Sequence, residues 1–395
     1  MNRTMKLAAC LAALILTAAV LAGCAPASVP DGAGKGAYLT GANVAEPQSG
    51  SNEIFTLADQ PAGAQVGVDF RGTLTQGAVR VQLTGPGAEV VWQAAGTQGT
   101  FAVNQVITLP QAGSYRLGLA WDGPVKLDNY DLYWSPDRVE IPAISPLALL
   151  SGVGMAAVAI GFGLYARRRG LDGKYLQWGA LAWVVAVALK FAWAVPVNPV
   201  LYKALQGGLP GWLASGTFYV YVGALTGVFE VALVWLALRF LPVGKGVTWQ
   251  KALAFGIGFG AVEALLLSLS PLATVISALR NPAGLPLSVL QQVAVLNYPF
   301  NSLAPVWERF FTIWIHIFCN ALIFYALNKR ESRWMWLAFA FKTAIDSFAA
   351  WGQVAGLDVP GRLALLEGIV GLFGVAAWLG TRRVEKAFPP VEEAK

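Results

Sequence analysis

Hydrophobic residues alternate with polar ones through much of the stretch between residues 37 and 134. The clearest alternating runs are Val66, Val68 and Phe70; Val79, Val81 and Leu83; Tyr115, Leu117, Leu119 and Trp121; and Tyr130, Leu132 and Trp134. Turns rich in Gly, Pro and Asp separate many of them. Alternation of this kind is typical of strands with one buried face. The pattern predicts a small antiparallel, jelly-roll-like β-sandwich over residues 37–140.

After Pro142 the pattern changes to apolar runs that are long enough to cross a membrane as helices. Seven such spans are predicted, at 145–166, 176–196, 216–240, 251–273, 305–327, 334–354 and 363–381. Residues 284–303 are too short and too rich in Pro and Asn to span, so we expect a re-entrant or interfacial segment there. The predicted fold is an α-helical polytopic membrane domain of about seven transmembrane helices, over 141–386, preceded by a small all-β sandwich.

The Lys and Arg residues in the loops indicate the orientation, because such residues concentrate on the cytoplasmic side of membrane proteins. The loops assigned to the inside carry Arg167, Arg168, Arg169 and Lys174; Arg239, Lys245 and Lys251; Lys329, Arg330 and Arg333; and Arg382, Arg383 and Lys386. The outside loops carry little beyond Lys203, Arg280 and Arg362. We therefore expect the β-domain outside and the C-terminus in the cytoplasm.

The N-terminus has the features of an export signal. Arg3 and Lys6 precede an apolar run that ends in Leu21-Ala22-Gly23-Cys24. Small residues directly before a Cys resemble a bacterial lipobox, which predicts that Cys24 is lipidated; a plain signal peptide or signal anchor is the alternative. We assign 1–24 to the signal, 25–36 to a linker and 387–395 to a cytoplasmic tail. The expected location is the bacterial cytoplasmic membrane.

Composition supports a membrane protein. Only 13% of the 395 residues are charged and 56% are hydrophobic, whereas about 25% of residues are charged in soluble proteins. The net charge of +6 does not indicate nucleic-acid binding, since the basic residues lie beside the apolar segments. Membrane lipid is the expected partner.

Ionisable residues recur inside the predicted spans, where each is unfavourable by about 2.5–3.5 kcal/mol on insertion scales. They are Lys190, Glu230, Glu263, Glu308, Arg309, His316, Lys342, Asp346 and Glu367. Glu308, Thr312, His316 and Asn320 share one helix face, and so do Lys342 and Asp346. Gly256, Gly258 and Gly260 allow a neighbouring backbone close to the span of Glu263. These stripes predict one buried polar site.

Each of these residues also has a structural explanation. A single buried acid is often a satisfied packing contact, and Lys342 with Asp346 is equally well explained as an internal salt bridge. Lys190 is expected to snorkel to the outer boundary, and Arg309 to snorkel there or to pair with Glu308.

Residues 145–385 resemble the YhfC family of intramembrane proteases, which belong with CAAX-protease-like and PrsW-like proteins. The resemblance rests on Gly227-Val228-Phe229-Glu230, on Leu236 to Phe240, on the Gly-rich run from Phe255 to Ala264, on Glu308-Arg309 with His316, and on Lys342 to Asp346. It implies an active site with paired glutamates, an Arg one turn later and His residues in later spans. One Glu would activate water, while His and Asn or Asp would bind a metal or stabilise the oxyanion.

This chain departs from that pattern at four positions. Val231 stands where the second Glu is expected, Val234 where the Arg is expected, and Phe259 and Lys342 where His residues are expected. The residues of the pattern that remain are Glu230, Glu263, Glu308, His316 and Asp346. Together with Lys342, a candidate donor to the oxyanion, they are the candidate catalytic residues. A zinc site usually needs three ligands that include His or Cys. With one His in the chain, we expect no metal and no cofactor.

The predicted function follows from these departures. We expect a divergent, catalytically impaired protease-fold protein that acts on or binds membrane-embedded peptides; if it is active, it would be a glutamic-type endopeptidase with Glu230 as base. Two alternatives stay open: a non-enzymatic receptor, and a proton-coupled transporter that uses the buried carboxylates and His316. Expected partners are transmembrane or lipidated peptides and an unknown ligand of the β-domain, and no nucleic acid.

Overall fold

The computed structural model describes residues 37–46, 48–136, 139–355 and 361–389. The chain separates into two compact units. The β-unit holds the strands together with residues 273–299, and the membrane unit holds the other long helices. The predicted signal, Cys24 and the linker lie outside the described residues, and so does most of the predicted tail.

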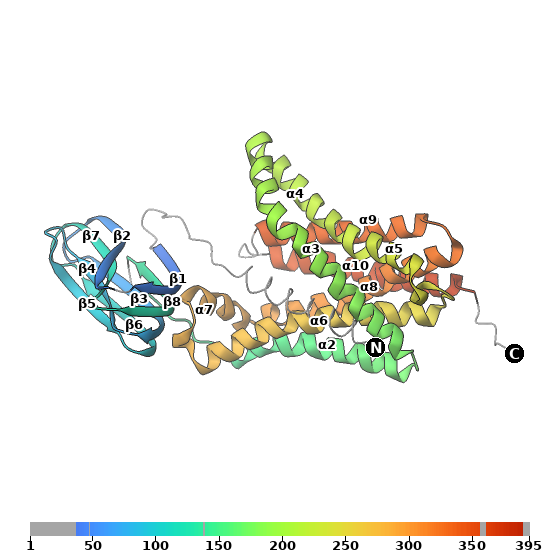
Figure 1. Cartoon of the computed structure of the whole chain (residues 1–395), viewed down its shortest axis with the longest axis horizontal. Coiled ribbons are helices and arrows are strands. Elements are labelled where there is room, and N and C mark those ends of the chain that lie inside the picture. The colour runs from blue at the N-terminus through green and yellow to red at the C-terminus, as the bar shows by residue number, and fades with distance from the viewer. Residues whose placement is uncertain (1–36, 47, 137–138, 356–360, 390–395) are drawn as a thin grey trace. The chain divides into compact units, whose positions relative to one another are not determined.

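Eight strands form two four-stranded antiparallel sheets in the β-unit (Figure 1). They are β1 Ala37–Glu46, β2 Gly50–Gln60, β3 Gln65–Gln76, β4 Val79–Thr84, β5 Val90–Gly96, β6 Gly99–Thr108, β7 Gly113–Trp121 and β8 Val125–Ser135. The strand order is β1-β8-β3-β6 in one sheet and β2-β7-β4-β5 in the other. Alternating side chains of both sheets, among them Val68, Phe70 and Leu117, form one buried core. The predicted all-β domain is confirmed.

Strand β3 is buried on both of its faces. Phe70 belongs to the core of the sandwich, whereas Asp69 and Arg71 alternate with it and are buried on the opposite face. Arg71 donates to both carboxylate oxygens of Asp69, at 2.5 and 2.6 Å. It also donates to the main-chain carbonyls of Pro282 and Leu285, at 3.2 and 3.4 Å. Arg71 thus fastens the segment that follows α6 to the sheet.

The short helix α7 (Leu287–Ala294) lies in this segment, between two 3-10 turns, Pro282–Gly284 and Val295–Asn297. The Leu287 N–H donates to the Asp131 carboxylate at 2.6 Å, which caps the first turn of α7. Leu287, Leu290 and Val293 are buried. Most of the stretch that the sequence marks as re-entrant or interfacial, 284–303, is therefore grouped with the β-unit. Its main chain is held there by Arg71 and Asp131.

Replacing Arg71 by Lys is expected to lower the free energy of unfolding of the β-unit by about 1.5–3 kcal/mol. Lys keeps the charge but loses the planar fork that joins Asp69 to two carbonyls. Denaturant unfolding of the whole chain in detergent measures this. The control is Arg116→Lys, since Arg116 forms an exposed pair with Glu53 at 3.0 Å, and it should change stability by less than about 1 kcal/mol. Equal effects of the two changes would show that the Arg71 contacts are not structural.

The membrane unit consists of long helices (Figure 1). They are α2 Leu149–Arg168, after the 3-10 turn Pro146–Ala148; α3 Gly173–Gly208; α4 Gly211–Thr226, which continues through the π-helical turn η2 Gly227–Ala232 into α5 Leu233–Phe240; α6 Trp249–Arg280, after the 3-10 turn Pro242–Gly244; α8 Pro299–Lys329; α9 Arg333–Ala355; and α10 Arg362–Ala387. Helix α6 begins in the membrane unit, and its last residues belong to the β-unit.

Among the described residues, six helical stretches are long and apolar enough to cross a membrane. They are α2 with its preceding turn, α3, α4 through α5, α6, α8 and α10. Helix α9 covers the remaining predicted span, 334–354, but is not among the six, and its polar residues Lys342 and Asp346 lower its mean hydropathy. The polytopic helical fold is confirmed, and membrane crossing by α9 stays a prediction.

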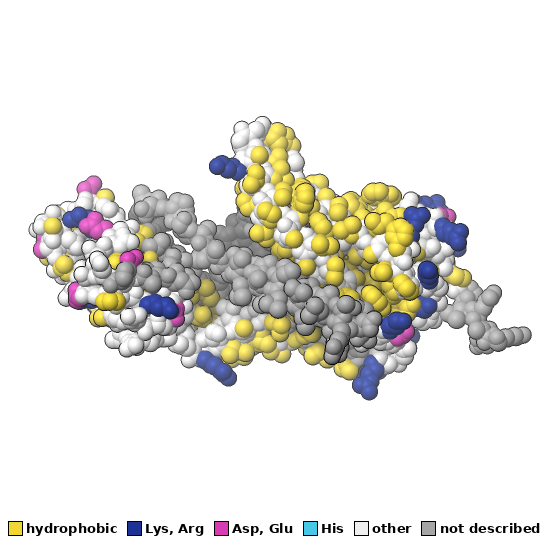
Figure 2. All heavy atoms as spheres, in the orientation of Figure 1, with side chains coloured by type: hydrophobic (Ala, Val, Ile, Leu, Met, Phe, Trp, Pro, Cys, Tyr) yellow, Lys and Arg dark blue, Asp and Glu magenta, His cyan; other side chains and the backbone are white. Residues whose placement is uncertain are grey.

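Exposed Lys and Arg side chains gather where α2, α8 and α10 end (Figure 2). The predicted orientation places these ends in the cytoplasm. A reporter fused after Trp134 should therefore be external, and one fused after Lys386 cytoplasmic. Alkaline phosphatase and fluorescent-protein fusions measure the two sides. If both reporters lie on the same side, the seven-span assignment is wrong.

Candidate functional site

A run of glycines lets α6 approach two neighbouring helices closely. A Cβ atom on Gly256 would lie 2.7 Å from the Ile317 Cα of α8, and one on Gly258 would lie 2.0 Å from the Leu176 carbonyl oxygen of α3. A larger residue at either position would push the backbones apart. The close approach predicted from the glycines is confirmed. It brings Glu263, further along α6, within reach of both neighbours.

Glu263 is the centre of several polar contacts. Trp183 Nε1 of α3 donates to Glu263 Oε2 at 2.7 Å, and His316 Nε2 of α8 lies 2.7 Å from the same oxygen. Arg309, also on α8, forms ion pairs with Glu263 Oε1 and with Glu308. Both oxygens of the Glu263 carboxylate are therefore already engaged by donors.

Glu230 lies in the π-helical turn Gly227–Ala232 and is 4% exposed. Single π-helical turns within α-helices occur often at functional sites. Lys190 Nζ lies 2.6 Å from Glu230 Oε1, and Lys342 Nζ lies 3.5 Å from Oε2. Lys342 also pairs with Asp346 at 3.3 Å, as the i, i+4 spacing predicts. Two lysines thus compensate one buried glutamate.

These contacts converge on one point of the membrane unit. Ligand atoms of Glu230, Glu263 and His316 lie within 4.8 Å of one another. Lys342 and Asp346 join this group through Glu230, and Glu308 joins it through Arg309. The structure therefore places all six predicted site residues in one network, which we call the central site. Their catalytic role stays a prediction.

Three members of the central site, Trp183, Lys190 and Arg309, are not among the predicted site residues. The sequence predicts a snorkelling Lys190, which is wrong, because its ammonium group pairs with Glu230. Arg309 pairs with Glu308 as predicted and reaches Glu263 as well. The spacing along each helix could have identified these residues. Trp183 and Lys190 are seven residues apart, and so are Arg309 and His316. Residues two turns apart share a helix face.

Two buried oxygen atoms in or beside the central site accept no hydrogen bond from the described residues and belong to no ion pair among them. They are Asn320 Oδ1 and Thr343 Oγ1. Asn320 lies one turn after His316 and donates to its carbonyl at 2.9 Å, and Thr343 follows Lys342. A buried acceptor without a partner is unfavourable by about 1–3 kcal/mol. These atoms can therefore receive donors from a ligand.

Three of the four positions where the sequence departs from the family pattern are apolar and packed. Val231, Val234 and Phe259 are all buried in the main hydrophobic cluster of the membrane unit. The Phe259 ring centroid lies 4.9 Å from that of His316. At these positions, the polar groups that the resemblance implies are replaced by side chains that stabilise the helix packing.

The part of the chain that follows the strands matches a known protein family. A sequence model of the YhfC intramembrane metalloprotease family matches residues 154–369, more than half of the chain. The chain belongs to this family. The uncharacterized membrane protein YhfC of Bacillus subtilis (strain 168) is 27% identical over 204 residues, which are 46% of this chain and 74% of that relative. The family resemblance inferred from the motifs is thereby confirmed.

Solved structures offer only distant likenesses. A protein of the Bacillus endospore appendages, described as a novel family of disulfide-linked pili, is 8% identical with a TM-score of 0.18. That likeness covers 28% of this chain and 94% of the other. A protein of infectious bursal disease virus, Gx strain, is 14% identical with a TM-score of 0.17, over 28% of this chain and 37% of the other. At TM-scores this low, neither likeness informs on the fold or function.

The YhfC family name implies a metal, and the central site provides a test of whether its residues fit one. Glu230, Glu263 and His316 are close enough together to share an ion. Their ligand atoms are occupied, however, because Lys190 and Lys342 contact both oxygens of Glu230. Arg309 and Trp183 contact Glu263, and His316 Nε2 faces the Glu263 carboxylate.

Cationic groups in direct contact with the ligand oxygens repel a divalent ion. In the tautomer in which His316 Nε2 donates its proton to Glu263, that nitrogen has no lone pair for a metal. As arranged, the residues of the central site do not fit a catalytic metal ion.

Proposed function

We propose that this YhfC-family protein binds membrane-embedded peptide segments at the central site and does not cleave them. One observation carries the proposal: Lys190, Lys342 and Arg309 neutralise the carboxylates that would otherwise serve as base or metal ligands. In this proposal the protein keeps the fold of its family and has lost the chemistry of a protease.

The arrangement around Glu230 supports a loss of catalysis. A general base must reach a water molecule with a free oxygen lone pair, whereas both Glu230 oxygens face ammonium groups. Val231 and Val234 provide no second carboxylate and no guanidinium beside it. The same ion pairs disfavour proton transport, since a relay needs carboxylates that exchange protons readily.

The unpartnered acceptors support peptide binding. Asn320 Oδ1 and Thr343 Oγ1 are buried in the spans, where no bulk water can satisfy them. A peptide segment that unwinds inside the membrane exposes main-chain N–H groups in need of acceptors. In this proposal the N–H groups of the peptide donate hydrogen bonds to the buried acceptor atoms of the protein. In this proposal the β-domain lies outside the cell, held by lipid on Cys24, and binds a separate ligand.

Replacing Glu230 by Gln separates binding from catalysis. Gln keeps the size of the side chain and one acceptor oxygen but removes the base. We expect the set of membrane-protein fragments in cells to be unchanged by Glu230→Gln, as measured by terminal proteomics against a strain that lacks the chain. Loss of a defined cleavage product in the Glu230→Gln strain, at normal protein level, would show that the protein is an active protease.

Photo-crosslinking tests the binding itself. Phe339 of α9 lies against Gly227, at the start of the turn that holds Glu230. A benzophenone side chain at position 339 should crosslink transmembrane peptides, and Thr343→Val should reduce the yield. The control position is Leu372 of α10, which is 73% exposed on the outside of the helices. Equal crosslinking at both positions would show that peptides meet position 339 only by random encounter in the membrane, and would contradict binding at the central site.

A further inference from the structure

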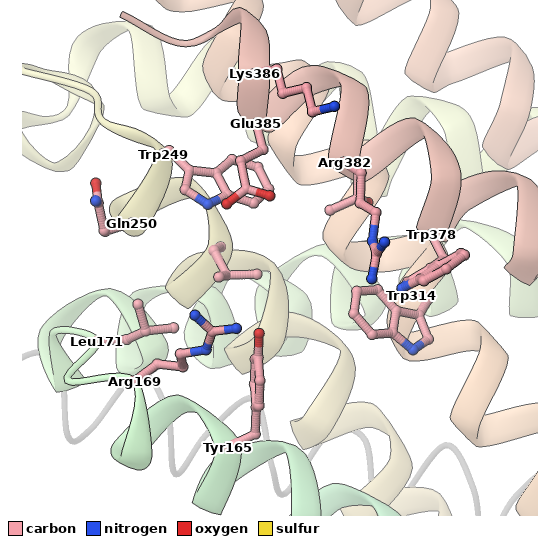
Figure 3. Close-up of a pocket in the computed structure, with 12 residues that line it drawn as sticks. Tyr165, Arg169, Leu171, Trp249, Gln250, Trp314, Trp378, Arg382, Glu385 and Lys386 are labelled. Carbon is pink, nitrogen blue, oxygen red and sulfur yellow. The ribbon is translucent and has the colours of Figure 1, made fainter. Parts of the chain in front are cut away.

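A cavity of about 540 Å³ lies among α2, α6, α8 and α10, apart from the central site (Figure 3). Its walls carry three tryptophans: Trp249 at the start of α6, Trp314 near the middle of α8, and Trp378 on α10. Trp314 precedes the end of α8 by fifteen residues, or about 22 Å at 1.5 Å per residue. The cavity therefore joins the basic helix ends to the depth of lipid acyl chains.

Basic side chains line the same cavity. They are Arg169 at the end of α2, and Arg382 and Lys386 near the end of α10, against a single carboxylate, Glu385. None of these four forms an ion pair within the part of the chain that the structure describes. The Arg382 guanidinium lies 4.0 Å over the Trp378 ring, and that of Arg169 lies 5.4 Å from the Tyr165 ring. Stacking orients each guanidinium and leaves its N–H groups for an anion.

A buried hydroxyl group is a second, independent sign of a ligand. Thr381 lines the cavity and is 3% exposed. Its Oγ1 has no hydrogen-bond partner among the described residues. A buried hydroxyl without a partner is unfavourable, so a polar group of a ligand would satisfy it. Thr381 is adjacent to Arg382, so one ligand can meet both.

We infer that this cavity binds an anionic phospholipid. Its phosphate contacts Arg169 and Arg382, its polar ester region contacts Thr381, and its acyl chains pack along Trp314 and Trp378. A small soluble anion would leave the space between the aromatic walls of the cavity empty. A zwitterionic lipid would leave the excess of basic groups unbalanced. Basic pockets between transmembrane helices bind lipid headgroups by this combination of charge and depth.

Native mass spectrometry of the full-length chain in detergent tests the inference. Phosphatidylglycerol is the probe, with phosphatidylcholine and inorganic phosphate in separate arms. The double variant Arg169→Gln with Arg382→Gln should bind phosphatidylglycerol about 25-fold more weakly, since each basic group contributes about five-fold. The matched control is Arg168→Gln with Arg383→Gln, whose exposed side chains neighbour the same residues but do not line the cavity. It should change the affinity by less than about two-fold.

Three outcomes would overturn the inference. They are equal losses in the two double variants, equal affinity for phosphatidylcholine, and displacement of phosphatidylglycerol by inorganic phosphate. If the Arg169 and Arg382 variant fails to fold, Thr381→Val gives a second test, because Val has nearly the same shape. It should weaken phosphatidylglycerol binding about five-fold, the loss of one hydrogen bond to a charged or ester group. Unchanged binding by a folded Thr381→Val chain would also refute the inference.

Discussion

Replacing Glu263 by Gln is expected to lower the free energy of unfolding of the membrane unit by about 3–5 kcal/mol. The Arg309 side chain is 11% exposed and pairs with Glu263 and Glu308. Gln keeps an acceptor for Trp183 and His316 but leaves the buried guanidinium with one carboxylate in place of two. Loss of one partner of a buried ion pair is among the largest effects a single substitution produces.

Steric trapping or thermal unfolding of the whole chain in detergent measures the effect of Glu263→Gln. The control is Glu308→Gln, which removes the other carboxylate on Arg309. The Glu308 side chain is 34% exposed and lies three residues inside the outer end of the predicted span 305–327, where water at the membrane boundary can replace it, so the loss should stay below about 1 kcal/mol. Adding Arg309→Gln to Glu263→Gln should restore most of the stability. A double variant that is less stable than Glu263→Gln alone would show that Arg309 stabilises the fold independently of this pair.

Local spacing in the sequence was sufficient to predict several parts of this protein. Alternating residues such as Val68 and Phe70 predict the strands, because strand periodicity depends only on neighbours along the chain. The Lys342–Asp346 pair and the close approach at Gly256 follow from helical spacing and side-chain size in the same way. These features need no knowledge of which helices are adjacent.

Contacts between distant segments could not be predicted in this way. Whether Lys190 pairs with Glu230 depends on how α3 and the π-helical turn are rotated about their axes, and a π-helical turn shifts that rotation. The contact of Arg71 with the Pro282 carbonyl joins residues 211 positions apart. The spacing of residues within one segment carries no information about contacts with a distant segment. The sequence identified the polar members of the central site, and tertiary packing decided which charges compensate them.

The double variant Phe259→His with Lys342→His is expected to bind about one zinc ion per chain, whereas the unaltered chain should carry no stoichiometric zinc. The family resemblance implies His at both positions. Phe259 already lies against His316, and Lys342 lies 3.5 Å from Glu230. The changes add two imidazoles to a group with one His and two carboxylates, and they remove one ammonium charge. Three or four ligands that include His are what zinc requires.

Elemental analysis of the purified full-length chain, dialysed against zinc and then against buffer, measures the stoichiometry. Size-exclusion chromatography shows whether the variant is folded. The matched control is Lys342→Met, which removes the same ammonium charge but adds no imidazole. It should retain well under one zinc per chain, since Lys190 and Arg309 still contact the two carboxylates and His316 is the one imidazole of the group. If the unaltered chain carries a zinc ion that chelators remove only slowly, the ion pairs of Lys342 and Lys190 do not exclude a metal. The protein would then have to be regarded as a metalloprotease with an unusual ligand set.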